Sequence, residues 1–450
     1  MTTLELENPA APSDNHTALA DLRGEDLIVG RTLNSPIYDQ NGVLLLAAGA
    51  TITSEFKKLL KSRAVSNVKI DQKDVSSVSL SLEQLAEACV DNSKFNFDTE
   101  ITKRLDSIVD GGLLTVQNKG PALKDSVVFH GKKAYSLEQR DHLLLQHKAS
   151  SESLDTMMKD VLKGGRVDGR AITGMVANYL TDLTSDADNL MNVAFETRGD
   201  AELADDSLKT AMYGMAIGVE MGLDAENISK LGLIGLVQNW GIIRVPRAIR
   251  HQNRPLTDIE FLEIKKHPIY TLEMLEKVSG FSSLIPLVAY QMHERMNGKG
   301  YPRGRSGNNI HLFARILQVA DAYTAMTTSR SHRPPLMPYT AMTSLLKESQ
   351  QKVFDPNVVR AFLQVLSLFP IGTLVSLSDG SVATVMRRNG MKYTQPIVRV
   401  IQDGRGSVLD PLDEDAILDL GDSSIQVVQA IPTPGKNELT EDPYVLRNAL

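Results

Sequence analysis

An almost unbroken helical period across residues 170–368 is the feature that most constrains the fold of this chain. At its start, apolar residues recur at the i, i+3, i+4, i+7 spacing of one helix face: Ile172, Met175, Val176, Tyr179 and Leu180. Such a stripe predicts an amphipathic helix that buries one side. After residues 370–372, Pro-Ile-Gly, the pattern changes to strand-like alternation around Asp379-Gly380. The sequence therefore predicts a mainly α protein with a short C-terminal β appendix.

The segment before the helical block has a different character. Apolar runs interrupted by Asn41-Gly42 indicate a β-hairpin, and residues 54–64 have helical spacing. We expect helices at Ser81–Cys89 and Leu137–Leu162. The predicted organisation is a disordered tail (1–25), a small β-rich α/β module (26–75), a helical linker region (76–169), a helical domain (170–368), the β appendix (369–432) and a polar tail (433–450).

Composition excludes several classes of function. With 48 Lys and Arg against 55 Asp and Glu, the net charge of −7 gives no general attraction to a nucleic acid polymer or to anionic lipid. The sequence contains no run of about 18 apolar residues, so it predicts no membrane span. The single cysteine, Cys89, excludes an intramolecular disulfide and a cysteine-based zinc site. We expect a cytoplasmic protein with no membrane association, whereas the oligomeric state cannot be predicted.

Residues 293–302 read His-Glu-Arg-Met-Asn-Gly-Lys-Gly-Tyr-Pro, which is too particular for an ordinary loop. This segment resembles the signature of the HD-GYP family of HD phosphohydrolases. The resemblance extends over about residues 170–388. It implies an HD-type helical bundle, and it implies relatives that hydrolyse cyclic di-GMP with two or three bound metal ions.

Several metal-ligand positions of the family carry other residues here. Where the resemblance implies the eponymous His-Asp pair, this chain has Gln238-Asn239, and the lysine expected three residues later is Ile242. Asp206 stands in place of a histidine, although its position before Ser207 is also typical of a capping carboxylate. Met292 replaces one histidine of a pair and is also typical of core packing.

The ligands that the resemblance leaves in place are His267, His293 and Asp321. His267 precedes a proline, so it is also typical of an interior or capping histidine. Neutral amide oxygens are weak ligands for iron or manganese. We therefore expect no binuclear iron or manganese centre, and either no metal or a single divalent ion. Without a bridged metal pair, hydrolysis should be absent or very weak.

A second group of residues is predicted to face a phosphate. Tyr301 lies in the Gly-Tyr-Pro turn, and Arg315, Arg330 and Arg333 match basic positions of the family, although Ser331 and His332 depart from it. Guanidinium groups bind phosphates in a bidentate manner. The alternative is that Tyr301 only packs the turn and that the arginines are solvated.

Three functions stay open from the sequence. The first is a degenerate HD-GYP signalling protein acting as a non-hydrolysing cyclic di-GMP receptor or regulatory interaction module. The second is a weak metal-dependent cyclic di-GMP phosphodiesterase. The third is a pure interaction scaffold that contacts a diguanylate cyclase or another regulator.

Overall fold

The chain divides into two compact units, one of residues 1–91 with 252–254 and one of residues 92–251 with 255–450. The structure is a computed structural model that describes residues 19–24, 27, 33–50, 52–63, 65–72, 74–75, 97–112, 115–197, 202–251, 256–330, 333–410 and 413–441. The predicted helix at Ser81–Cys89, the single cysteine, Ser331 and His332 lie outside these residues. Each unit is described by itself.

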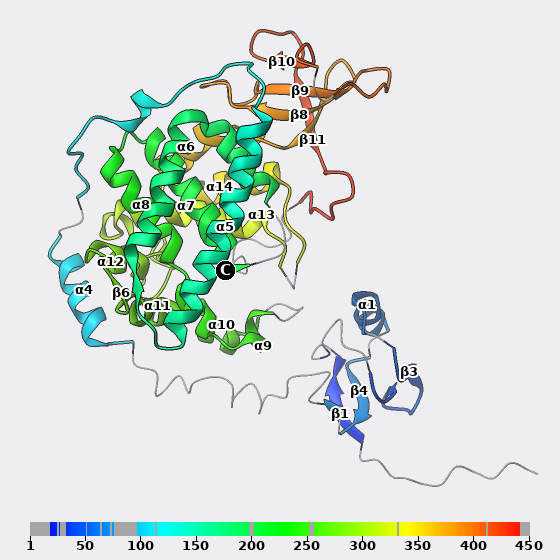
Figure 1. Ribbon diagram of the computed structural model, residues 1–450. Coiled ribbons are helices and arrows are strands. Elements are labelled where there is room, and N and C mark those ends of the chain that lie inside the picture. Colours follow the sequence, from blue (N-terminus) through cyan, green and yellow to red (C-terminus); the bar gives the residue numbers. More distant parts are fainter. Residues whose placement is uncertain are drawn as a thin grey trace, which may run out of the picture. The chain divides into compact units, whose positions relative to one another are not determined.

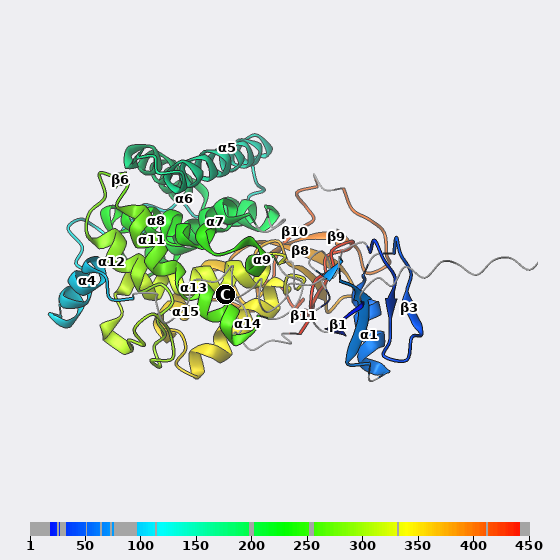
Figure 2. The ribbon, with the colours of Figure 1, turned by 90° about the horizontal axis from the view of Figure 1, so that it is seen from below.

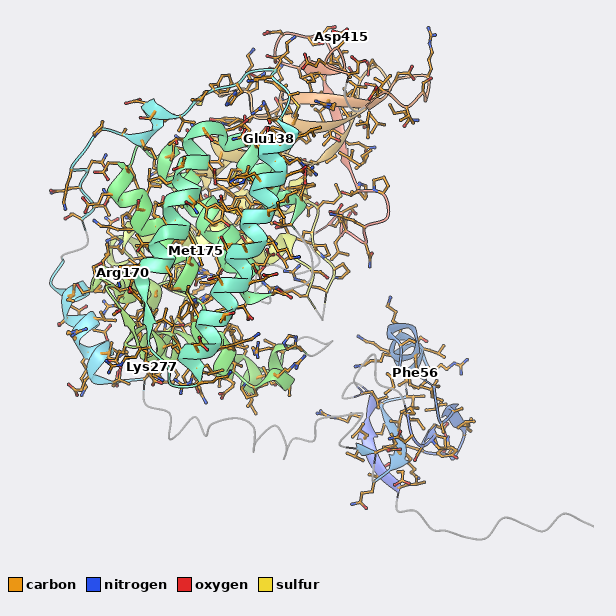
Figure 3. All side chains as sticks on the ribbon, in the orientation of Figure 1. Phe56, Glu138, Arg170, Met175, Lys277 and Asp415 are labelled. Carbon is orange, nitrogen blue, oxygen red and sulfur yellow. The ribbon has the colours of Figure 1, made fainter. Side chains whose placement is uncertain are left out.

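The N-terminal unit is a four-stranded antiparallel sheet with one helix. Its strands lie in the order β1-β4-β2-β3: β1 (Leu19–Arg23), β4 (Asn67–Asp71), β2 (Ile37–Tyr38) and β3 (Leu44–Leu46). Helix α1 (Ser54–Ser62) contributes Phe56, labelled in Figure 3, to a small apolar core with Ile37, Val68 and Ile70. The Asn41-Gly42 turn joins β2 and β3, as predicted, and Gly42 has a φ of 82°.

The structure corrects the predicted disordered tail of residues 1–25. Residues 19–23 of that segment form β1, which pairs with β4 from Leu19 opposite Asp71 to Arg23 opposite Asn67. The strand was missed because its short polar sequence carries little alternation, and its pairing partner lies almost fifty residues further along the chain.

The larger unit is a bundle of helices around one core, as the helical period predicts (Figure 1). Its first helices are α4 (Glu100–Asp110), α5 (Leu137–Leu162), α6 (Gly169–Glu196), α7 (Leu203–Glu220) and α8 (Ala225–Val237). Then come η3 (Trp240–Arg244), α9 (Arg247–Arg250), α10 (Asp258–Ile264), α11 (His267–Leu275) and α12 (Leu284–Tyr290). The bundle ends with α13 (Leu312–Thr327), α14 (Pro338–Gln350) and α15 (Pro356–Leu366).

Short elements complete this unit. They are the 3-10 turns η2 (Leu123–Ser126) and η4 (Gly307–Asn309) and the parallel two-stranded pair β5 (Val167–Asp168) and β6 (Val278–Ser279). None of the helices in the described part of the chain is long and apolar enough to cross a membrane.

Helix α5 belongs to the bundle and not to a linker. Its buried side chains Leu143, Leu154, Met158 and Val161 lie in the same apolar core as those of α6 and α7, and Figure 2 shows α5 lying along α6. The predicted boundary at residue 170 therefore falls inside a packed unit, although the helix itself has the predicted bounds.

The β appendix is a five-stranded antiparallel sheet in the order β10-β9-β8-β7-β11. Its strands are β7 (Leu374–Leu377), β8 (Val382–Arg387), β9 (Ile397–Gln402), β10 (Ile417–Asp419) and β11 (Val427–Ile431). Gly380, with a φ of 85°, forms the predicted turn between β7 and β8. Arg387 joins the sheet to α6 through a bidentate pair with Asp186, with contacts of 2.7 and 2.9 Å.

Part of the predicted polar tail is also ordered by packing. The Leu439 backbone N–H donates to the Pro335 carbonyl at 2.9 Å and its carbonyl accepts from the Met337 N–H at 3.0 Å. The prediction of a polar tail over residues 433–450 stays a prediction. A polar composition does not exclude such backbone pairing with a distant segment.

Candidate functional site

Residues from four segments converge in the middle of the bundle. Gln238 and Asn239 lie between α8 and η3, His267 begins α11, His293 follows α12, and Asp321 lies on α13. The close approach of η3 to α11 depends on Gly241, because an added Cβ there would lie 2.1 Å from the His267 carbonyl oxygen. A larger residue could not occupy this position without separating the two elements.

The Asp321 carboxylate is held by two carboxamides. Its Oδ1 accepts a hydrogen bond from Gln238 Nε2 at 3.0 Å and one from Asn239 Nδ2 at 3.1 Å. Burial and then the nearby Asp206 charge raise the pKa of Asp321 to about 6, although the Gln238 bond and Arg295 oppose the rise. The amide groups thus take up the oxygen that a metal ion would otherwise use.

The two histidines are hydrogen-bonded to each other. His267 Nδ1 donates to the Ile264 carbonyl at 2.7 Å, so its Nε2 accepts the proton of His293 Nε2 at 2.8 Å. This assignment requires neutral rings, and burial lowers the pKa of His267 to about 4 and that of His293 in the same direction. His293 Nε2 also lies 3.4 Å from Asn239 Oδ1, so Asn239 stands between the imidazole pair and Asp321.

Tyr301 covers this histidine pair. Its ring stacks on His293 with a centroid separation of 4.9 Å and an interplanar angle of 5°. Its hydroxyl is buried without a hydrogen-bond partner, and burial raises its pKa. In this arrangement Tyr301 packs against the histidine pair, and its role in binding a ligand stays a prediction.

Glu294 anchors the loop that carries Tyr301, a role that the sequence did not reveal. Its two carboxylate oxygens accept the backbone N–H groups of Arg303 at 2.8 Å and Arg305 at 2.7 Å. Burial raises the pKa of Glu294 despite these bonds. Its place beside His293 in the signature segment was the available signal, but its partners are backbone groups, which no side-chain pattern identifies.

Asp206 lies near Asp321 and is already paired. Its Oδ1 accepts from Thr328 Oγ1 at 3.0 Å, and its Oδ2 forms an ion pair with Arg330 at 2.7 Å. Arg330 is more exposed than Asp206, with 31% of its side chain accessible. The predicted ligand Asp206 and the predicted phosphate contact Arg330 therefore neutralise each other.

The other two predicted arginines have protein partners. Arg315 pairs with Asp355 at 2.7 Å, the residue that caps α15. Arg333 is buried and donates to the carbonyls of Ala325 and Met326 at the end of α13. Both contacts stabilise the bundle, so a role in binding phosphate stays a prediction for these residues.

The substituted positions Ile242 and Met292 are apolar in their surroundings. Met292 lies in the main core with 1% exposure, and Ile242 is half-buried in η3. A cation that acts on Asp321 and that the sequence missed is Arg295. It lowers the pKa of Asp321, and its guanidinium carbon lies 5.2 Å from the Phe354 ring centroid. Arg295 was visible in the signature segment, but nothing in the pattern linked it to Asp321.

These donors do not fit a bridged metal pair. Within the described ranges, no three His, Cys, Asp or Glu side chains come together as a group that could hold a metal ion. Two amide N–H groups point at Asp321, whereas a metal needs lone pairs pointing inward. One donor remains unused, because Gln238 Oε1 is buried without a partner.

Comparison with known proteins agrees with this architecture. Residues 191–358 match the model of the HD domain family. The chain is 27% identical over 284 residues to a cyclic di-GMP phosphodiesterase of Pseudomonas aeruginosa, a match that covers 63% of this chain and 67% of the relative. It is 26% identical over 240 residues to a cyclic di-GMP phosphodiesterase of Borreliella burgdorferi, which covers 53% of this chain and 62% of that relative. Residues 191–358 of this chain thus form an HD domain.

A third relative matches over a shorter segment. The 3′3′-cGAMP-specific phosphodiesterase 1 of Vibrio cholerae is 36% identical over 127 residues, 28% of this chain and 29% of the relative. The chain thus spans about two thirds or less of the lengths of these relatives. The fold class predicted from the sequence, a mainly α HD-type bundle with a small β-rich module and a β appendix, is confirmed.

Proposed function

We propose that this protein is a regulatory member of the HD-GYP family that does not hydrolyse cyclic di-GMP and acts as its receptor or as an interaction module. One observation carries the proposal. Asp321, the carboxylate that the family pattern assigns to metal, accepts hydrogen bonds from Gln238 and Asn239 at 3.0 and 3.1 Å.

The site lacks the free ligands that a metal pair requires. Two adjacent divalent cations need several anionic and imidazole ligands that are free to bind. Here the amide side chains donate hydrogen bonds to Asp321, and His267 and His293 are hydrogen-bonded to each other. No metal-bound hydroxide is available without such a pair, so attack on phosphorus lacks its nucleophile.

Arg330 supports the receptor form of the proposal. It is the predicted phosphate contact whose side chain is partly exposed, and its ion pair with Asp206 could be exchanged for a phosphate. Arg315 and Arg333 contribute less, because each stabilises the end of a helix.

A weak phosphodiesterase is the second candidate, favoured by the similarity to two cyclic di-GMP phosphodiesterases. It would use a single divalent ion held by His267, His293 and Asp321, and it would require the imidazole pair to give up its shared proton. That requirement makes it the less favourable alternative.

Calorimetric titration with cyclic di-GMP, run beside a product assay, separates these functions. We expect binding in the presence of chelator, loss of binding in Arg330→Ala and no product with or without manganese. Arg360→Ala on α15, an exposed arginine, is the matched control. Product formed at a rate that depends on manganese would establish the phosphodiesterase, and no binding at all would leave the interaction module.

Restoring the family residues tests whether Gln238 and Asn239 limit metal binding. The double variant Gln238→His/Asn239→Asp should bind more manganese than the natural protein, because an imidazole and a carboxylate replace two amide groups. Gln351→His/Asn309→Asp makes the same exchange at exposed positions outside the site. Equal metal content in the two double variants would mean that Gln238 and Asn239 do not limit metal binding.

A further inference from the structure

Helix α4 packs against α11, which begins with His267, and against α12, which directly precedes the segment of His293. Its buried Leu105 and Val109 share an apolar cluster with Ile269 and Leu272 of α11 and with Leu287 and Tyr290 of α12. His267 is the first residue of α11, and His293 follows α12 by three residues. A shift of α4 would therefore act on both elements at once.

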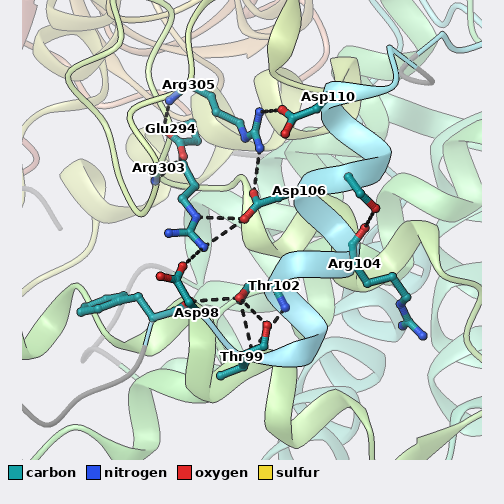
Figure 4. A network of polar contacts seen from close by, with 11 residues as sticks. Asp98, Thr99, Thr102, Arg104, Asp106, Asp110, Glu294, Arg303 and Arg305 are labelled. Atoms are coloured by element: carbon teal, nitrogen blue, oxygen red, sulfur yellow. Dashed lines mark hydrogen bonds and ion pairs between the residues drawn. The ribbon is translucent and has the colours of Figure 1, made fainter.

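The polar face of α4 forms ion pairs with the loop that follows the Gly-Tyr-Pro turn (Figure 4). The central Asp106 accepts from Arg303 Nε at 3.0 Å and from Arg305 Nη2 at 2.7 Å. Asp98 extends the contact to Arg303 at 2.5 Å, and Asp110 extends it to Arg305 at 2.7 Å. Three carboxylates thus neutralise two guanidinium groups.

The same loop is held from its other side by the site itself. Glu294 accepts the backbone N–H groups of Arg303 and Arg305, and Glu294 is the neighbour of His293. Tyr301, two residues before Arg303, stacks on the His293 ring. An unbroken set of contacts therefore leads from Asp106 through the loop to His293.

We propose that α4 is a control element of the site. Its docking on Arg303 and Arg305 positions Tyr301 and His293, so undocking of α4 would release the loop that packs on His293.

The energetics suit a reversible contact. An isolated helix of 11 residues is marginal in water, so α4 depends on docking for its stability. The outer carboxylates, Asp98 and Asp110, are 64% and 68% exposed and are screened by salt, whereas Asp106 is 18% exposed. Elements of this kind open at lower free energy than the core. Asp106 is the positioning residue of this contact.

Hydrogen exchange on the full chain tests the proposal. Asp106→Asn should speed amide exchange about tenfold or more in residues 97–112 and 293–305 and leave α7 unchanged. It should also shift the imidazole nitrogen resonances of His293, and Asp106→Glu should restore them in part. The matched control is Lys103→Ala, which removes an exposed ion pair from the same helix.

An effect of Asp106→Asn confined to α4, with the loop and the His293 resonances unchanged, would overturn the coupling. The same result from Lys103→Ala would overturn the assignment to Asp106. Neither readout requires hydrolysis or nucleotide binding, so failure here is distinct from failure of the proposed function.

Discussion

Two carboxylates of the bundle, Asp186 and Asp321, show how differently one fold can hold a negative charge. Asp186, at the joint with the β appendix, receives the bidentate guanidinium of Arg387 at 2.7 and 2.9 Å. Asp321, in the candidate site, receives only the neutral amides of Gln238 and Asn239. The negative charge of Asp186 is neutralised by Arg387 within the protein, whereas the negative charge of Asp321 can still be neutralised by a proton or a cation.

The largest effect is expected at the joint. Asp186→Asn leaves the Arg387 guanidinium, which is 1% exposed, without its main counter-charge. Breaking a buried pair in this way costs about 3 to 5 kcal/mol of unfolding free energy. Urea unfolding at neutral pH measures the loss.

Asp422→Asn is the control for this variant, since Asp422 is 78% exposed and pairs with Lys392 at 3.3 Å. We expect a change within about 0.5 kcal/mol. Similar losses in the two variants would remove the contrast between a buried and an exposed pair.

The next effect depends on pH and concerns Asp321. The folded pKa of about 6 lies above the ordinary value of 3.8, so the folded state favours the protonated acid. The stability that this preference provides is present below pH 3.8 and is lost as pH rises through about 6. Asp321→Asn carries no such titration. Its stability relative to the natural protein should therefore rise by about 2 kcal/mol between pH 4.5 and 7.5.

Denaturant unfolding of both proteins in the presence of chelator, at several pH values across that window, measures this difference. Other titrating groups cancel to a first approximation because both proteins share them. A relative stability that falls with rising pH would show that a fixed positive charge, and not two amides, governs Asp321. The contrast with Asp186 would then disappear.

The smallest effect distinguishes two tyrosines. The Tyr301 hydroxyl in the site is buried without a partner, so Tyr301→Phe should change stability by less than about 1 kcal/mol. Tyr135 at the joint donates its hydroxyl proton to the Met386 carbonyl, so Tyr135→Phe should cost about 1 to 2 kcal/mol. Thermal unfolding compares them. A larger loss at Tyr301 would indicate that its hydroxyl has a partner in solution.

Local patterns were the successful part of the sequence prediction. The helix at Leu137–Leu162 has the predicted bounds, and Asn41-Gly42 and Asp379-Gly380 form the predicted turns, because helical period and turn chemistry depend on neighbouring residues. The errors concern distant contacts. Strand β1 depends on β4, and the assignment of α5 to the bundle depends on the core that it shares with α6 and α7.

The sequence by itself determined which chemical groups the site contains: two amides where the family pattern has an imidazole and an acid, beside His267, His293 and Asp321. Only the tertiary structure decided how they are used. Gln238 and Asn239 lie more than eighty residues from Asp321, yet both donate to the same oxygen, and Asp106 reaches Arg305 across almost two hundred residues. Residue identity fixes donors and acceptors, but their pairing depends on packing between helices, which no local spacing encodes.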